Sequence, residues 1–288
     1  MTNDTEIPTG LAKVLASATS TEQYRKASEI PAELDNILAS PKSVFETPIV
    51  IPETQKAIVA FVDMLGTSAL MESITRDNAP KIYGTINGIS EKFQTTFSEL
   101  SDKYEDSVSI MMISDSFVVS IPHEYNAFRY LLTLLAKFQY DCLFSYSEPM
   151  RGAVATGDIL KVVGENKIIG PAFIRAYKIE MENAIFPRIV IDSDIIEDKE
   201  LCPQSTTGLP IALDKDGIRY IDFLAIENAD VSSIKQKTNT KRTEYAGDNR
   251  NLKKLQKWHW LQTFLEQKAN ACVDCCQQAR PVMPFTNQ

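Results

Sequence analysis

The chain has 288 residues, of which 44% are hydrophobic and 24% charged, and its formal net charge is -8. This composition is typical of a folded globular protein, and the acidic balance argues against the basic surface of a nucleic-acid-binding protein. We find no apolar segment of membrane-spanning length, no signal peptide and only five cysteines. These features predict a cytoplasmic protein without a disulfide scaffold that binds neither membranes nor nucleic acids.

Hydrophobic patterning divides the chain into three predicted regions. Residues 1–55, rich in Thr, Ser, Ala and Pro, form a predicted N-terminal extension. Residues 56–224 contain the regular strand and helix patterns and form the predicted folded domain. Residues 225–288 begin as a basic, polar and partly mobile linker and end in a helix from about residue 250 to 276.

The predicted elements of the central region follow the order β-α-β-β-α-β, with further elements after it. This order is that of the ferredoxin-like α+β arrangement. We expect strands at 56–63, on both sides of a turn within 107–122, at 150–163 with a turn at Gly157 and Asp158, at 187–192 and at 217–224, and helices at 67–76, 80–104, 124–146 and 171–185.

Two aspartates stand out in this pattern. Asp63 ends an apolar strand, where an unpaired charge is costly, and Asp115 lies in the turn of the central hairpin. Their strands can be neighbours in such a sheet, so the two carboxylates would meet at one edge. Carboxylates suit Mg²⁺ or Mn²⁺, and backbone N–H groups near Gly66 and Thr67 would face a phosphate. The alternative is a capping Asp63 and a turn-forming Asp115, but the pair in this order favours a metal site.

Four segments, taken in order, resemble class III nucleotidyl cyclases: FVDMLG (61–66), MISDSFVVS (112–120), RGAVATGDI (151–159) and GPAFIRAYKIEMENAIFPRIVID (170–192). The resemblance covers roughly residues 56–224. It implies a cyclase catalytic domain there and a head-to-tail homodimer with shared active sites. It also implies two Mg²⁺ or Mn²⁺ ions per site, held by Asp63, Asp115 and the Met64 carbonyl.

The chain departs from the residues that read a purine base in this family. Ser109 stands six residues before the hairpin aspartate, where purine cyclases carry Lys or Glu. Lys167 stands three residues before Gly170, where adenylyl cyclases carry an acid. Ile174 replaces the usual helix asparagine. The metal aspartates are therefore kept while the purine-reading set is absent.

The same helix lacks the family's catalytic arginine. Lys178 occupies its register and would be the cation that stabilises the phosphorus in the transition state. Arg175 is the alternative cation, and Tyr177 is a nearby candidate for substrate contact, both out of register. A solvated helix face would explain the two cations equally well.

A cyclase without the purine set resembles the bacterial pyrimidine cyclases of Pycsar antiphage defence. This resemblance implies cyclic UMP or cyclic CMP made from UTP or CTP and read by a separate effector outside any stable complex. Lys167 offers only donors, which suit the carbonyls on both sides of N3 in UTP, so we expect UTP with CTP second. The alternatives are an adenylyl or guanylyl cyclase with an unusual base pocket and a degenerate, non-catalytic nucleotide-binding domain.

Three weaker signals lie in the C-terminal region. Cys272, Cys275 and Cys276 could form half of a zinc site, but no second pair follows, and we favour plain thiols. Eight Lys or Arg residues between 235 and 257 could bind triphosphate, although a solvated surface is the simpler interpretation. Trp258 and Trp260 are expected to anchor the last helix by packing.

Outside this region, Arg151 could contact substrate or only brace its hairpin.

Overall fold

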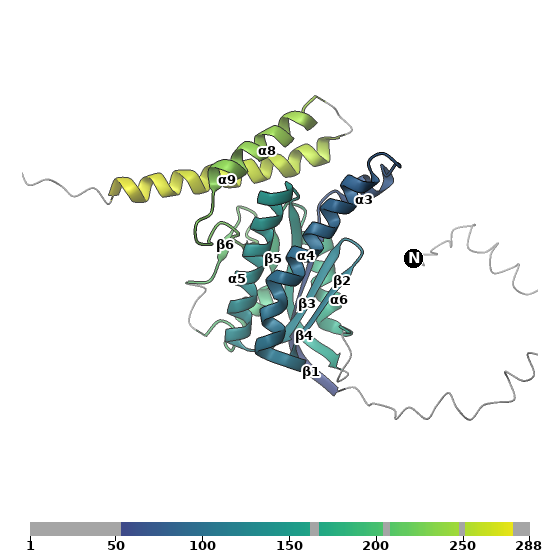
Figure 1. Cartoon of the computed structure of the whole chain (residues 1–288). Coiled ribbons are helices and arrows are strands. Elements are labelled where there is room, and N and C mark those ends of the chain that lie inside the picture. Colours follow the sequence, from purple (N-terminus) through teal and green to yellow (C-terminus); the bar gives the residue numbers. More distant parts are fainter. Residues whose placement is uncertain (1–52, 162–166, 204–207, 248–250, 279–288) are drawn as a thin grey trace, which may run out of the picture. The chain divides into compact units, whose positions relative to one another are not determined.

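A seven-stranded sheet in the order β2-β3-β1-β4-β5-β7-β6 organises the domain (Figure 1). The computed structural model describes residues 53–161, 167–203, 208–247 and 251–278. Most of the predicted N-terminal extension lies outside the described residues. The strands are β1 (Glu53–Met64), β2 (Ser109–Ile113), β3 (Ser116–Pro122), β4 (Met150–Lys161), β5 (Ile189–Ile191), β6 (Ile211–Leu213) and β7 (Arg219–Ile221). The helices are α3 (Thr67–Glu72), α4 (Ala79–Tyr104), α5 (Tyr125–Asp141), α6 (Pro171–Asn183), α7 (Ser193–Glu197), α8 (Val231–Tyr245) and α9 (Leu252–Gln278).

The first four strands have the ferredoxin-like arrangement that the order of elements predicts. β1 pairs antiparallel with β3 on one side and with β4 on the other, and β2 pairs antiparallel with β3. The register places Asp63 opposite Ser116 of β3 and opposite Arg151 of β4. The ends of three strands therefore meet at Asp63, and the predicted α+β fold is confirmed.

Side chains of β1 alternate between the two faces of the sheet, as expected for a strand. Ile58, Ala60 and Val62 belong to the large core under α4 and α5, which cross one face side by side (Figure 1). Val59 and Phe61 belong to a smaller core that α6 covers on the opposite face. Asp63 continues this second series, so its carboxylate belongs to the α6 face.

The predicted turn in the fourth strand is wrong. β4 continues through Gly157, which pairs with Ala57 of β1. A Cβ atom at Gly157 would lie 3.4 Å from the Cα of Ala172 in α6. The glycine therefore serves the close packing of α6 on the strand, and the Gly-Asp pair is not a turn signal here.

The predicted mobile linker is also wrong for most of its length, because α8 occupies 231–245. Asp230 caps this helix by accepting hydrogen bonds from the backbone N–H and the hydroxyl of Ser233. Only Ile234 and Thr238 are buried along it. Two buried positions on an otherwise polar helix give too weak a periodicity for detection from sequence.

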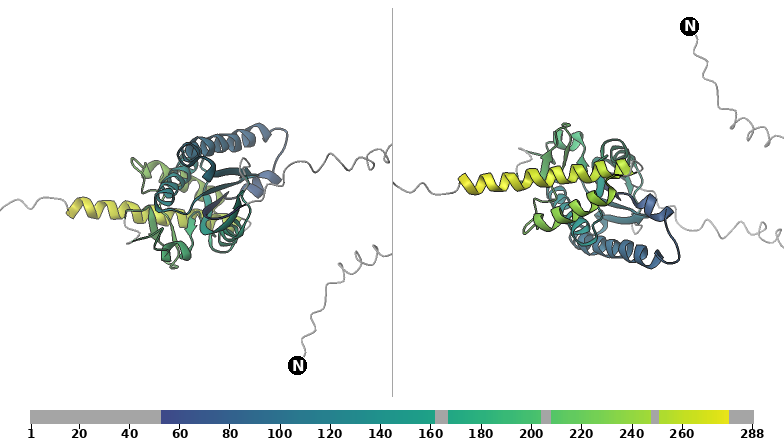
Figure 2. Two further views of the ribbon diagram at one scale, coloured as in Figure 1. Left: turned by 90° about the horizontal axis from the view of Figure 1, so that it is seen from below. Right: turned by 90° about the horizontal axis from the view of Figure 1, so that it is seen from above.

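The long C-terminal helix α9 pairs with α8, and the view from above shows the two side by side (Figure 2). Trp258 is buried in the cluster that joins α8, α9 and the end of α5, and Trp260 donates its indole N–H to Asp214 at 3.0 Å. Both tryptophans therefore pack as predicted. The side chains of Cys272, Cys275 and Cys276 lie outside the described part of the structure. Among the described helices, none combines the length and apolarity needed to cross a bilayer.

Candidate metal and nucleotide site

Asp63 is held by one side chain from each neighbouring strand. The Ser116 hydroxyl donates to its Oδ1 at 3.1 Å. The Arg151 guanidinium donates to its Oδ2 from Nη2 at 3.2 Å and from Nε at 3.4 Å. Both partners follow directly from the strand register, because Ser116 and Arg151 are the cross-strand neighbours of Asp63.

A second carboxylate, Glu180 of α6, approaches the same guanidinium. Its Oε1 lies 2.7 Å from Arg151 Nε, and its side chain is only 2% exposed. Arg151 therefore bridges Asp63 at the strand edge and Glu180 under the helix. We did not predict Glu180 from the sequence. The available signal was its spacing, since Ala172, Ala176 and Glu180 recur every four residues on the buried face of α6.

The pKa of Asp63 is raised above its ordinary value. Burial is the main cause, the Arg151 charge opposes it, and the nearby Asp115 charge adds to it. Ionisation of Asp63 is thus less favourable than for a free aspartate, even with an arginine beside it. A divalent cation would reverse this balance, because a nearby positive charge favours the carboxylate. The donor set of Asp63 and Asp115 fits Mg²⁺ or Mn²⁺.

Asp115 lies in the two-residue turn between β2 and β3. Its predecessor Ser114 has a positive φ of 58°, which closes the turn. The Asp115 carbonyl accepts the backbone N–H of Met64 at 3.4 Å, so the hairpin turn is tied to the end of β1. The structure thus brings Asp63 and Asp115 to the same edge of the sheet.

The turn after β1 holds Gly66 and Thr67, the residues whose backbone N–H groups were predicted to face a phosphate. Gly66 has a φ of 93°, a conformation that favours glycine, and α3 spans only six residues. The Thr67 hydroxyl is buried and donates to the Met64 carbonyl at 2.8 Å. That carbonyl, a predicted metal ligand, keeps one lone pair. The Thr67 side chain is therefore committed to the turn, and only backbone N–H groups of the turn could face a phosphate.

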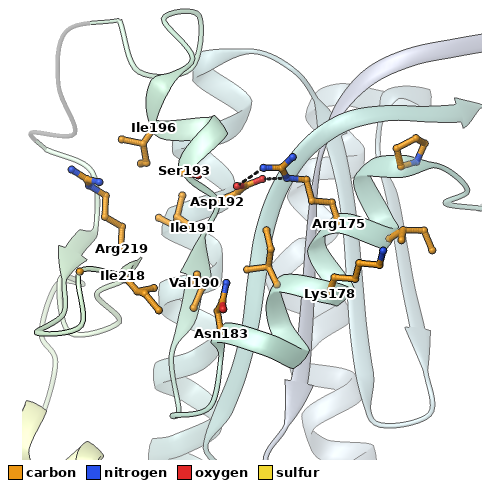
Figure 3. A pocket seen from close by; sticks show the side chains of 14 residues that line it. Arg175, Lys178, Asn183, Val190, Ile191, Asp192, Ser193, Ile196, Ile218 and Arg219 are labelled. Carbon is orange, nitrogen blue, oxygen red and sulfur yellow. Dashed lines mark hydrogen bonds and ion pairs between the residues drawn. The ribbon is translucent and has the colours of Figure 1, made fainter. Parts of the chain in front are cut away.

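Arg175 and Lys178 lie beside a different part of the sheet. They line a pocket of about 820 Å³ between α6, β5, α7 and residues 217–219 (Figure 3). Arg175 is paired with Asp192, with one contact at 2.9 Å, and with Asp194 at 2.7 Å. Lys178 is exposed and forms no hydrogen bond or ion pair with another described residue. Of the two predicted cations, only Lys178 is free to meet a substrate.

The other predicted substrate contacts are spread over the domain. Tyr177 packs its ring edge-on against Phe61, with ring centroids 5.4 Å apart, on the side of α6 that faces β1. Ser109 is a half-buried residue of β2, and Lys167 is exposed just before α6. Two strands, β3 and β1, separate β2 from β4 in the sheet. Within one chain, the structure brings Asp63 and Asp115 together but not the predicted base-reading pair.

Lys257 of the basic C-terminal stretch lies near this site. Lys257 of α9 is half-buried; burial and the Arg151 charge lower its pKa, whereas the Asp63 and Glu180 charges raise it. Other lysines of the stretch pack on the protein, as Lys237 does over the ring of Phe144. Lys257 is thus a cation of the stretch whose electrostatic neighbours include Asp63.

A second group of metal-ligating side chains lies elsewhere, at His123, Asp198 and Glu200. Asp198 Oδ2 is 2.9 Å from His123 Nε2 and 3.2 Å from Lys56 Nζ, and its Oδ1 accepts the Glu200 backbone N–H at 2.9 Å. His123 Nδ1 faces Glu200 at 3.5 Å. Because Lys56, His123 and a backbone N–H already contact Asp198, its contacts are accounted for without a metal ion.

No model of a known protein family matches the chain, and no curated protein matches it. Among solved structures, a bacterial light-regulated adenylyl cyclase is 13% identical with a TM-score of 0.43, over 80% of this chain and 67% of that one. The guanylyl cyclase Cya2 is 13% identical with a TM-score of 0.35, over 59% and 92%. A class III adenylyl cyclase-like ATP-binding protein from Pseudomonas aeruginosa is 14% identical with a TM-score of 0.38, over 49% and 34%. These are remote similarities of fold.

Proposed function

We propose that the protein is a nucleotidyl cyclase of class III that converts UTP to 3′,5′-cyclic UMP and pyrophosphate. The observation that carries the proposal is the convergence of Asp63 and Asp115 at one sheet edge, with Arg151 beside them. Four sequence segments that resemble these cyclases, found in the family's order, support it. Fold alone would not, since many functions share this architecture.

Each residue of the edge has a part in the proposed reaction. Asp63 and Asp115 would hold two divalent ions, with the Met64 carbonyl as a further ligand. When bound, such ions lower the pKa of the attacking hydroxyl and neutralise the triphosphate. Arg151 would bind the triphosphate oxygens, because its planar fork matches phosphate geometry. The 3′-hydroxyl oxygen then attacks the α-phosphorus, and the bond to pyrophosphate breaks.

A homodimer would complete the site. One chain does not bring Lys178 to the Asp63 edge, so the cation for the α-phosphate would be the partner subunit's Lys178. Apolar side chains are exposed on α6 and on the hairpin that carries Asp115, where a second copy could cover them: Ile113, Ile174, Tyr177 and Met181. Arg175 would then support the site through its pairing with Asp192 and not by contact with phosphate.

The pyrimidine preference rests on Ser109 and Lys167. The side chain of Ser109 is shorter than the Lys or Glu with which purine cyclases contact the base at this position. Its hydroxyl can still donate or accept one hydrogen bond. Lys167 would donate to a uracil carbonyl and meet the amino group of cytosine badly. A mismatched donor pair costs about 1–3 kcal/mol, roughly ten- to a hundredfold in preference. Cyclic UMP would then serve as a second messenger for a separate effector in antiphage defence.

Product analysis tests the proposal directly. The purified chain is incubated with each of the four NTPs and Mn²⁺, and the products are identified by mass spectrometry. We expect cyclic UMP as the main product. Cyclic CMP would keep the cyclase and overturn the base assignment, whereas cyclic AMP or cyclic GMP would overturn the pyrimidine class. Binding without any cyclic product would indicate a non-catalytic nucleotide-binding domain.

Subunit mixing tests the shared site. Asp63→Ala and Lys178→Ala are each expected to be inactive, because each removes one half of every site. Random exchange makes half of the dimers mixed, and each mixed dimer carries one intact site, so about a quarter of the wild-type activity should return. Exchange is verified with differently tagged chains. No recovery despite exchange would contradict a site built from two chains.

A further inference from the structure

Glu180 occupies a position that α6 would otherwise give to a small apolar side chain. It follows Ala172 and Ala176 on the buried face of the helix, and its side chain is 2% exposed. Burying a carboxylate at such a place is costly unless a cation accompanies it. The cation is Arg151, whose Nε lies 2.7 Å from Oε1 of Glu180.

The Arg151 guanidinium is divided between two acids. Its Nε and Nη2 groups direct their hydrogens to Asp63, at 3.4 and 3.2 Å. Oε1 of Glu180 is buried and accepts no aligned hydrogen bond from another described residue, although it is the closer of the two acids. The contact with Glu180 is thus ionic, and a small rotation of the guanidinium would turn it into a hydrogen bond.

A metal ion at Asp63 would change how the Arg151 guanidinium is shared between Asp63 and Glu180. The ion would take the lone pairs of Asp63 that Arg151 uses and would repel the guanidinium. The Arg151 side chain is 26% exposed, so without another anchor it could turn into solvent. Glu180 cannot follow it, because it is fixed on the packed face of α6. Lys257 also faces this group, but as a cation it cannot retain an arginine.

We infer that Glu180 is a positioning residue, which takes over the Arg151 guanidinium when a metal ion occupies Asp63 and keeps it aimed at the nucleotide triphosphate. The inference rests on the proposed nucleotide site. Without Glu180, Arg151 would compete with the metal for Asp63 in the free protein and would be lost from the site in the loaded protein. Metal affinity and nucleotide affinity should therefore fall together.

Glu180→Gln tests this with little change in shape, and Glu182→Gln is the matched control, because Glu182 lies on the same helix and is exposed. Mn²⁺ binding is measured without nucleotide by the electron paramagnetic resonance of free Mn²⁺. Binding of a fluorescent UTP analogue with Mn²⁺ is measured by anisotropy. We expect both affinities to fall about ten- to a hundredfold in Glu180→Gln, as for other residues that orient a metal site, and to stay unchanged in Glu182→Gln.

A double-mutant cycle separates positioning from a general loss of structure. If Glu180 acts through Arg151, adding Glu180→Gln to Arg151→Gln should weaken nucleotide binding no further. Glu180→Asp should restore part of the affinity, and thermal melting checks that each variant is folded. Unchanged affinities in Glu180→Gln, or additive effects in the double variant, would overturn the inference. Because these are binding measurements, they decide it even if no NTP is cyclised, an outcome that would instead reject the proposed activity.

Discussion

Arg188 and Arg151 are two of the arginines that each bind two acids, and they differ in what they stabilise. Arg188, just before β5, is 2% exposed and pairs with Asp214 and Asp216, reaching Asp216 Oδ1 at 3.1 Å. Trp260 completes the group by donating to Asp214. Arg151 binds Asp63 only through longer contacts of 3.2 and 3.4 Å and leaves Glu180 without an aligned hydrogen bond.

The acids report the difference through their pKa values. The pKa of Asp216 is lowered, chiefly by its hydrogen bond from Arg188. The pKa of Asp63 is raised, because burial outweighs the attraction of Arg151. In the first group both acids are paired with the arginine without any ligand, although Nε of Arg188 has no hydrogen-bond partner among the described residues. In the second group Asp63 keeps a raised pKa, which a bound cation would lower. Such local conflict is characteristic of functional sites.

Among the changes that test this difference between the two groups, Asp63→Asn should have the largest effect, on turnover. Removing the charged ligand should lower turnover at least about a thousandfold, since the metal loses a ligand. Because the folded-state pKa of Asp63 is raised, its ionisation destabilises the fold once the pH rises above the ordinary value of 3.8. At pH 7 the metal-free variant should therefore melt no lower than the wild type.

Mn²⁺ supplies the control for that variant. It should raise the melting temperature of the wild type and leave Asp63→Asn unchanged, because a ligand stabilises only a protein that binds it. Near-normal turnover in a folded Asp63→Asn protein would remove Asp63 from the metal site.

Arg188→Met should have the next largest effect, on stability. Breaking a buried pair leaves uncompensated charge, and the free energy of unfolding should fall by about 3–5 kcal/mol. Arg151→Met should cost less than Arg188→Met, because the pKa values of both its acids, Asp63 and Glu180, are raised despite its charge, so each acid can bind a proton when the arginine is removed. Urea titration of both variants measures the difference. Equal losses would mean that the Asp63 group is also a structural clamp.

Glu148→Gln should have the smallest effect, and one that depends on pH. Burial raises the pKa of Glu148 to about 7, from an ordinary value of 4.5, and Lys241 opposes the shift only partly. The neutral acid therefore stabilises the fold fully below pH 4.5, and this contribution is lost as the pH rises through 7. Glu148→Gln should raise the free energy of unfolding by about 1–2 kcal/mol at pH 8, after allowance for solvent screening, and by almost nothing at pH 4.5.

Urea titrations at the two pH values measure this difference. Glu182→Gln, an exposed change on α6, is the control and should be neutral at both. A gain of equal size at both pH values would show that the charge of Glu148 is not responsible.

The sequence by itself determined six of the seven strands and the meeting of the two aspartates, whereas β6, at Ile211–Leu213, lies in a stretch for which no strand was predicted. β1 is apolar at every position from Ala57 to Val62, so its sequence does not say which face carries Asp63, but few topologies are open to a βαββαβ order. Asp63 and Asp115 therefore had to reach one edge. Helix α8 was missed because only two of its residues are buried, which gives a weak helical periodicity. Strand β4 was wrongly divided because Gly157, which serves the packing of α6, resembles a turn residue in the sequence.

Only the tertiary structure decided which cation meets which acid. Arg151 and Arg175 both looked capable of serving a phosphate site, but strand register gives Arg151 to Asp63, and the rotation of α6 gives Arg175 to Asp192. The same rotation buries Glu180 against Arg151. These pairings depend on how separate elements pack, to within a fraction of a helical turn, and hydrophobic periodicity does not specify a rotation that finely.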